Sequence, residues 1–263
     1  MTTQHKTSTA GDLDRIVPVG TRVLMIVGGF GCGKTEVSVN LALQLAQSGR
    51  PVQIADMDLV NPYFRCREAR ELMERHHIRV VAPPGEQAWA DVPIILPEIA
   101  GMLNPSEGML TLFDVGGDDV GARALAAFRS MIDEGSYELW QVINSKRPFS
   151  DTPERCAQMR SLIEHASRLH VTGLLVNSHL VEGTTPDIVL EGLALGREVA
   201  AQQDLPVRGL AVMDELADDP ALAPGQGGVD VPMLRLTRRM LPPWIRPAPD
   251  TTGDERHTGG SHG

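Results

Sequence analysis

The chain has 263 residues and a formal net charge of -10 at neutral pH, and 42% of its residues are hydrophobic but only 4% are aromatic. This length suits one large α/β domain whose core is built from aliphatic side chains. The acidic charge argues against general binding to nucleic acids or to anionic membranes, because both surfaces require an excess of lysine and arginine.

The cysteines and the chain ends indicate a compartment and the domain limits. The three cysteines are widely spaced and form no CxxC pair, which is typical of a reduced protein without a metal cluster of its own. Residues 1–10 lack the apolar core of a secretory signal, and no apolar run of about 18 residues is present. We therefore expect a cytoplasmic protein with one domain over residues 16–245, between disordered tails over 1–15 and 246–263.

Short apolar runs alternate with longer amphipathic segments along this domain. The expected strands cover residues 23–27, 52–55, 79–82, 109–115, 139–143, 173–176 and 207–212. The expected helices cover residues 36–47, 64–75, 93–103, 122–134, 153–169, 186–203 and 234–241. Repeated strand-to-helix connections imply right-handed crossovers. The sequence therefore predicts an α/β fold with a mostly parallel sheet and helices on both faces, in which ligands bind beyond the carboxyl ends of the strands.

The first strand and helix flank a glycine-rich loop that fits the pattern GxxxxGK[ST]. Its glycines allow backbone N–H groups to surround phosphate oxygens, and the helix N-terminus adds partial positive charge. Lys34 would contact the β- and γ-phosphates and act in catalysis, and Thr35 would ligate Mg²⁺. The expected phosphate-binding residues are Gly28, Gly29, Gly31, Cys32, Gly33, Lys34, Thr35 and Glu36. These features predict a P-loop NTPase.

Two carboxylates, Asp56 and Asp58, follow the second strand. Such a pair requires a nearby cation, and a nucleotide with Mg²⁺ supplies one. Asp58, favoured over Asp56, would position the attacking water as a catalytic residue and is also a candidate metal ligand. The alternative is an acidic turn that caps the helix expected from residue 64.

The fourth strand ends in Asp114, which is followed by paired glycines in a Walker B arrangement with a DxxG switch. Asp114 would hold Mg²⁺, directly or through water. The N–H of Gly117 would contact the γ-phosphate and move when that phosphate leaves. A buried strand that ends in a solvated turn is the alternative interpretation.

Polar side chains also follow the fifth and sixth strands. Asn177 stands where a purine ring would lie, and an amide can both donate to and accept from a base edge; an ordinary loop asparagine also fits this spacing. The segment 144–149 contains the adjacent cations Lys146 and Arg147 before a helix that Asp151 and Thr152 would cap. These cations could face phosphates or a partner, and the sequence leaves both possibilities open.

The order of the motifs over residues 20–215 resembles the MinD/ParA and nitrogenase iron protein class of P-loop ATPases, the CobQ/CobB/MinD/ParA nucleotide-binding domains. The resemblance rests on the phosphate loop, Asp-x-Asp-x-x-Asn, Asp-Val-Gly-Gly-Asp and Gly-Leu-Leu-Val-Asn-Ser. It implies that the cofactors are ATP and Mg²⁺, that Asn177 contacts adenine, and that a homodimer closes around two nucleotides. A slow ATPase that acts as a switch on an unidentified protein partner is the implied function.

The sequence departs from this class in two places. Gly29 occupies the position of the signature lysine in KGGxGK, and no cysteine for an iron–sulfur cluster follows Gly117. The basic, amphipathic segment over residues 233–244 could correspond to the C-terminal membrane helix of MinD proteins. Its short length favours a final helix packed on the domain, so that membrane binding is not expected.

Other classes of function remain open on the sequence. A phosphotransferase or an ATP-dependent ligase similar to dethiobiotin synthetase would bind a small acid near residues 144–149. A GTPase or a non-hydrolysing binding module is the third alternative. No guanine-binding NKxD motif is present, because Asn177 is followed by Ser178, His179 and Leu180, which favours adenine.

Overall fold

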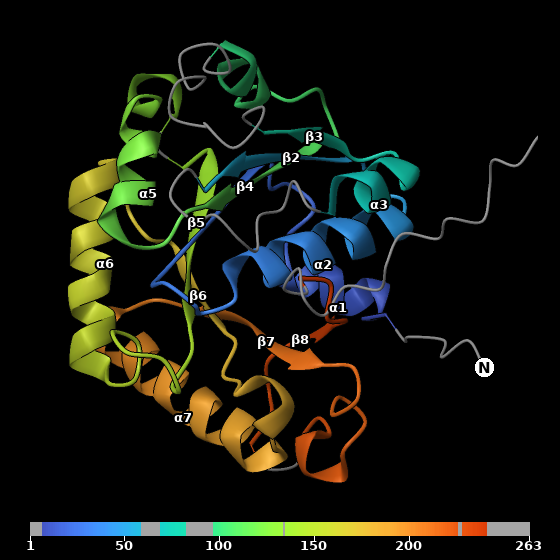
Figure 1. Ribbon diagram of the computed structural model, residues 1–263, viewed down its shortest axis with the longest axis vertical. Helices are drawn as coiled ribbons and strands as arrows, with labels where there is room; N and C mark the ends of the chain where they lie inside the picture. The colour runs from blue at the N-terminus through green and yellow to red at the C-terminus, as the bar shows by residue number, and fades with distance from the viewer. Residues whose placement is uncertain (1–6, 59–68, 83–96, 134, 226–227, 241–263) are drawn as a thin grey trace, which may run out of the picture.

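The computed structural model describes residues 7–58, 69–82, 97–133, 135–225 and 228–240. Its strands form one parallel sheet in the order β3-β2-β4-β1-β5-β6-β7-β8 (Figure 1). The strands are β1 (Val23–Val27), β2 (Val52–Met57), β3 (Arg79–Val81), β4 (Leu110–Val115), β5 (Tyr137–Ile143), β6 (Gly173–Val176), β7 (Val207–Met213) and β8 (Met233–Leu236).

Helices connect these strands. They are α1 (Ala10–Ile16), α2 (Lys34–Gln47), α3 (Arg70–Arg75), α5 (Asp118–Ala126), α6 (Pro153–Ser167) and α7 (Pro186–Gln203), and residues 97–102 are also helical. Short 3-10 turns cover η2 (Arg129–Met131), η3 (Val181–Gly183) and η4 (Pro220–Leu222). Proline follows a threonine cap at the start of both α6 and α7, where Thr152 and Thr185 accept a backbone N–H from the first turn.

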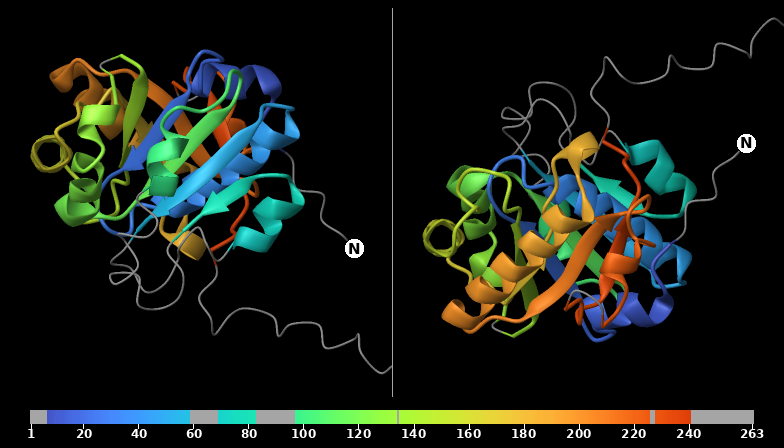
Figure 2. Two further views of the ribbon diagram at one scale, coloured as in Figure 1. Left: turned by 90° about the horizontal axis from the view of Figure 1, so that it is seen from above. Right: turned by 90° about the horizontal axis from the view of Figure 1, so that it is seen from below.

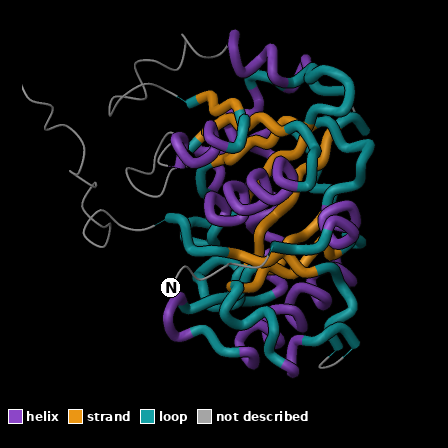
Figure 3. Tube along the Cα trace, turned by 90° about the vertical axis from the view of Figure 1, so that its right-hand side faces the viewer, coloured by secondary structure: helices purple, strands orange, loops and turns teal. Residues whose placement is uncertain are grey.

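The sheet lies between two layers of helices, as Figures 1 and 3 show. Alternate side chains of β1 enter different cores, because successive residues of a strand point to opposite faces. Leu24 and Ile26 pack with α1, α2 and α3, whereas Val23, Met25 and Val27 pack with α5 and α6. The expected α/β fold with helices on both faces is confirmed.

Strand β1 occupies the position where the strand order reverses. It pairs with β4 on one side and with β5 on the other, so that the loop after β1 opens at a crevice between neighbouring connections. The register aligns Asp114 with both Ile26 and Asp56. The views in Figure 2 show the twisted sheet with helices on either side of it. This topology brings the sequence motifs to one edge of the sheet.

The structure corrects three sequence-based predictions. Residues 233–236 form the edge strand β8, parallel to β7, and not the start of a helix over 234–241. Residues 10–16 form helix α1 with buried Leu13 and Ile16, although a disordered tail was expected through residue 15. Helix α5 begins earlier than the predicted 122–134 segment and ends at Ala126. Asn61 of the Asp-x-Asp-x-x-Asn motif, residues 64–68 of the predicted 64–75 helix, residues 93–96 of the predicted 93–103 helix and the tail over 246–263 lie outside the described residues.

Candidate functional site

The loop between β1 and α2 requires glycine at several positions. Gly28, Gly31 and Gly33 have φ values of 142°, 74° and 89°, in the region that favours glycine. A Cβ at Gly28 would lie 2.8 Å from the carbonyl oxygen of Val142, and a Cβ at Gly33 would overlap the Asn177 amide. Gly29 is different, because among the described residues a Cβ there would meet only Met159, at an ordinary 3.6 Å. The motif therefore takes the curved backbone that surrounds phosphates in P-loops.

The first residue of α2 directs its ammonium back over this loop. Lys34 is 7% exposed and its Nζ donates to the carbonyl oxygen of Gly29 at 3.2 Å. The Cβ position of Gly117 lies 3.4 Å from the same Nζ and 3.2 Å from the backbone N of Phe30. The end of β4 is thus in contact with the phosphate loop, as the predicted role of Gly117 requires.

Three buried carboxylates gather beside Lys34 and Thr35. Asp56 accepts the backbone N–H of Asp58 at 3.0 Å, and Ser38 Oγ donates to Asp114 Oδ1 at 3.1 Å. Among the residues that the structure describes, Oδ2 of Asp114 is buried without a hydrogen-bond partner. Burial and the neighbouring Asp56 carboxylate raise the pKa of Asp114 to about 7, although the Thr35 hydroxyl and the Lys34 ammonium act in the opposite direction.

This donor set fits a hydrated Mg²⁺ that shares its coordination with phosphates. Within the described ranges, no group of three or more His, Cys, Asp or Glu side chains is arranged as a complete metal site. Mg²⁺ in nucleotide sites usually takes only one or two carboxylates and keeps waters and phosphate oxygens. The Thr35 hydroxyl and the unpartnered oxygen of Asp114 supply such a partial set.

Asn177 at the end of β6 contacts the phosphate loop. Its side chain is 3% exposed and Nδ2 donates to the carbonyl oxygen of Cys32 at 2.9 Å. The amide therefore stabilises the loop, and the proposed contact with a base remains a prediction. The Cys32 thiol is fully buried, which raises its pKa, so that Cys32 contributes its backbone and its packing to the loop.

The sequence did not single out His179 as a site residue. Its Nδ1 accepts the N–H of Val181 at 3.4 Å, and Val181 has a left-handed φ of 57°, which is strained for a β-branched residue. A Cβ at Gly33 would lie 3.3 Å from Nε2 of His179. Burial, together with the Arg147 and Arg238 cations, lowers the pKa of His179 to about 4, so that a neutral imidazole faces the phosphate loop.

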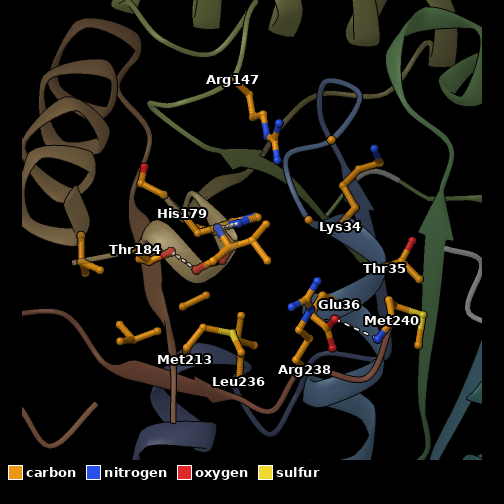
Figure 4. A pocket seen from close by; sticks show the side chains of 18 of the residues that line it. Lys34, Thr35, Glu36, Arg147, His179, Thr184, Met213, Leu236, Arg238 and Met240 are labelled. Carbon is orange, nitrogen blue, oxygen red and sulfur yellow. Dashed lines mark hydrogen bonds between the residues drawn. The ribbon is translucent and has the colours of Figure 1, made fainter. Parts of the chain in front are cut away.

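A cavity of about 780 Å³ connects the phosphate loop with the ends of β6, β7 and β8 (Figure 4). Its polar end holds Lys34, Thr35 and Asp58, and its other end is mainly aliphatic, with Val212, Met213, Leu216, Leu236 and Met240 among its lining residues. Such a cavity, polar at one end and apolar at the other, has the character of a small-molecule site. The aliphatic wall was missed from sequence because it includes β8, which was predicted as a helix.

A row of polar side chains on α2 holds the chain that follows β8. We call Glu36, Asn40 and Gln44 the polar row. Gln44 Nε2 donates to the carbonyl oxygen of Arg235, and Asn40 bonds both the N–H and the carbonyl of Thr237, at 2.9 Å each. Glu36 accepts the N–H groups of residues 239 and 240 at 2.8 and 3.0 Å. The Glu36 carboxylate is thus engaged by protein, which leaves its backbone N–H as the group for the predicted phosphate contact.

Comparisons with known proteins identify the fold. No family model matches the chain. A segment of 117 residues is 28% identical to von Willebrand factor A domain-containing protein 8 of Mus musculus, covering 44% of this chain and 5% of that protein.

Two solved structures give the structural comparison. Signal Recognition Particle 54 kDa protein from Aeropyrum pernix K1, in complex with GDP, superposes with a TM-score of 0.52 at 16% identity, over 74% of this chain and 42% of that chain. Cell division protein FtsY from Thermotoga maritima gives a TM-score of 0.46 at 18% identity, over 79% and 64%. The chain therefore spans 5% of the curated relative and less than two thirds of these two solved proteins.

The chain has the P-loop NTPase fold. The superposition with the 54 kDa protein and the parallel sheet centred on β1 both support this statement. In the described part of the chain, no helix has the length and apolar character needed to cross a bilayer.

Proposed function

We propose that this chain binds ATP with Mg²⁺ at the loop over residues 28–35, hydrolyses it slowly, and acts as a nucleotide-driven switch on a protein partner. The observation that carries the proposal is that Lys34 and the incompletely hydrogen-bonded carboxylate of Asp114 meet at a glycine loop of the required geometry. Both groups are buried, and each lacks a full complement of partners that a metal–triphosphate complex would supply.

Each residue has one role in this proposal. Backbone N–H groups of the glycine loop bind the phosphate oxygens, and Lys34 leaves Gly29 to contact the β- and γ-phosphates. Thr35 and Asp114 hold Mg²⁺, which neutralises charge on the transferring phosphoryl group. Asp58, 5% exposed and directed at Gly116, orients the attacking water. Gly117, in contact with Lys34, reports the presence of the γ-phosphate to α5.

The proposed base is adenine, bound in the aliphatic end of the cavity beside Asn177. Leu180 stands where a guanine-binding NKxD motif carries its carboxylate, and 45% of its surface is exposed. The MinD/ParA-like order of motifs also favours adenine, and it supports the homodimer and the protein partner of this proposal.

The test is a comparison of nucleotide binding by the wild type and by Lys34→Ala, with Lys146→Ala as the control. We expect the wild type to bind ATP with Mg²⁺ more tightly than GTP, and we expect Lys34→Ala to abolish binding because the phosphates lose a buried, charged donor. Lys146 pairs with Glu191 and its removal should leave ATP affinity unchanged. Isothermal titration calorimetry measures the nucleotide affinities of the wild type and of the two variants. Unimpaired ATP binding by Lys34→Ala would contradict the proposal, and a preference for GTP would contradict its choice of base.

A further inference from the structure

The loop that follows β5 places Arg147 against the phosphate loop. A Cβ on Gly31 would lie 3.7 Å from Nε and 3.8 Å from Cδ of Arg147. Figure 4 shows the Arg147 side chain extending from its own loop towards the phosphate loop, with Lys34 on the other side. Arg147 also lines the cavity. The arginine is therefore in contact with the segment that would surround the phosphates.

This position is fixed by a hydrogen-bonded turn. Asn144, which is fully buried, accepts the N–H of Arg147 at its carbonyl oxygen at 3.0 Å and the hydroxyl of Ser150 at 2.8 Å. Its side-chain Oδ1 accepts the N–H of Lys146 and of His179, which joins the loops after β5 and β6. Phe149 completes the turn with a left-handed φ of 70°. Such a turn holds the backbone of residue 147 in place before any ligand arrives.

The two adjacent cations of this turn have different surroundings. Lys146 points to α7 and pairs with Glu191. Arg147 Nε is buried without a hydrogen-bond partner, and among the described residues no carboxylate pairs with this guanidinium. A buried donor without a partner is costly, so that its persistence beside a binding loop indicates a ligand that satisfies it.

The charges around the cavity indicate what this ligand is. Three lysine or arginine side chains line the cavity in the described part of the chain, namely Lys34, Arg147 and Arg238. Arg238 already pairs with Glu182 at 2.6 Å. Lys34 and Mg²⁺ together leave a nucleoside triphosphate with net negative charge. Arg147 is the remaining cation with unused donors, and a planar guanidinium fits phosphate oxygens well.

We propose that Arg147 binds the phosphate chain of the nucleotide as a second, same-chain cation beside Lys34. This inference rests on the proposed function, since it requires a triphosphate in the phosphate loop. It assigns the positive charge of the 144–150 turn to the nucleotide and not to a partner. Gly29 occupies the position of the signature lysine in the phosphate loop. Arg147 would therefore supply a second cation that this loop itself lacks.

The experiment compares ATP affinity in Arg147→Gln, Arg147→Lys and Lys146→Gln, each with Mg²⁺, at low and high salt. We expect Arg147→Gln to weaken ATP binding by about tenfold or more, because a charge-assisted contact is lost. Arg147→Lys should recover part of this loss, and Lys146→Gln should match the wild type. The difference between Arg147→Gln and the wild type should shrink at high salt, since added ions screen a partly exposed charge.

Several outcomes would overturn the inference. Wild-type affinity in Arg147→Gln would show that the guanidinium does not contact the ligand. Equal losses in Arg147→Gln and Arg147→Lys, or a loss that does not depend on salt, would assign the effect to packing instead of charge. Circular dichroism of each variant verifies that the fold is intact. A wild-type protein that binds no nucleotide would contradict the proposed function itself, and this result is distinct from wild-type affinity in the variant.

Discussion

At the scale of single residues, the site combines groups whose protonation depends on their neighbours. Asp114 accepts a hydrogen bond from Ser38 and His179 lies beside Gly33, and burial shifts the pKa of each towards its neutral form. For Asp114, a bound cation would reverse this shift. For His179, the nearby arginines Arg147 and Arg238 add to the effect of burial. The site therefore contains a neutral imidazole at ordinary pH, which can donate or accept a hydrogen bond without adding charge.

The first residue-scale prediction concerns the pH dependence of stability at His179. Its pKa falls from 6.5 to about 4 in the folded protein, so that between these values the unfolded chain binds a proton that the folded chain does not. The free energy of unfolding consequently decreases as the pH falls through this window. We expect His179→Gln to lose less stability than the wild type between pH 6.5 and pH 4, as measured by urea unfolding.

His170 offers the matched control for this experiment, because 79% of its side chain is exposed. His170→Gln controls for the replacement of a histidine at the surface, and the change in the pH profile should be larger for His179→Gln than for His170→Gln. If the profile of His179→Gln were parallel to that of the wild type, the assignment of a neutral, partly buried imidazole would be wrong.

At the scale of elements, helix α2 performs two tasks at once. Its N-terminus carries Lys34 and Thr35 at the phosphate loop, and its polar row holds the backbone that follows β8. Three polar side chains spaced four residues apart lie on one face of a helix, and here that face meets a chain segment instead of water. Helix α2 therefore connects the phosphate loop with one wall of the cavity.

The element-scale prediction tests the centre of the polar row. Asn40 is 2% exposed and bonds both backbone groups of Thr237, so that Asn40→Ala would leave a part-buried N–H and carbonyl without these partners. We expect a loss of about 1–3 kcal/mol in the free energy of unfolding, measured in urea. Gln202→Ala serves as the control, because Gln202 makes an exposed contact with Glu198 on α7. A loss no larger than that of the control would show that the polar row contributes little to stability.

The elements show which structural features the sequence predicts and which it does not. Continuous apolar runs predicted β1 to β7 to within a few residues, since central parallel strands are buried on both faces. Edge strand β8 was predicted as a helix because its alternating basic residues resemble an amphipathic face, and its pairing with β7 depends on distant residues. Helix α1 was missed because Gly11, Asp12 and Asp14 make the segment polar, although Thr9 caps it.

In the site as well, features that depend on neighbouring residues were predicted, and features that depend on residues far apart in the chain were not. The phosphate loop, Asp58 and Asp114 were predicted from local motifs, and the structure brings them together. Sequence could not decide whether Lys146 or Arg147 faces the loop, because the answer depends on Glu191, a distant residue on α7. The contact between Asn177 and Cys32 joins two loops that are far apart in the chain, and no spacing rule could have predicted it.

At the scale of the whole molecule, the cavity lies beside exposed apolar side chains. Phe30 in the phosphate loop and Phe149 in the neighbouring turn both line the cavity and are 70% and 64% exposed. Exposed aromatic residues at the edge of a binding site often mark a surface that a partner covers. A second copy that closes over the nucleotide, as the proposed function requires, would bury both rings.

The corresponding prediction is a dimer that depends on ATP. Asp58→Ala should bind ATP but hydrolyse it more slowly, because the attacking water is no longer positioned. We expect this variant to have twice the monomer mass with ATP and Mg²⁺ and the monomer mass with ADP, as measured by size exclusion with light scattering. Lys34→Ala is the control and should remain monomeric with either nucleotide. An Asp58→Ala protein that binds ATP without any change in mass would contradict the dimer switch.

The polar row has a consequence for how the specificity of this site can change. The hydrogen bonds that it makes to residues 235–240 reach backbone groups, whereas the side chains of Leu236, Arg238 and Met240 line the cavity. Attachment of this segment and selection of the ligand therefore depend on different atoms. Substitutions at these three positions can reshape the cavity wall for another base or substrate, while α2 continues to hold the same backbone. The fold can therefore acquire a new ligand preference without losing strand β8.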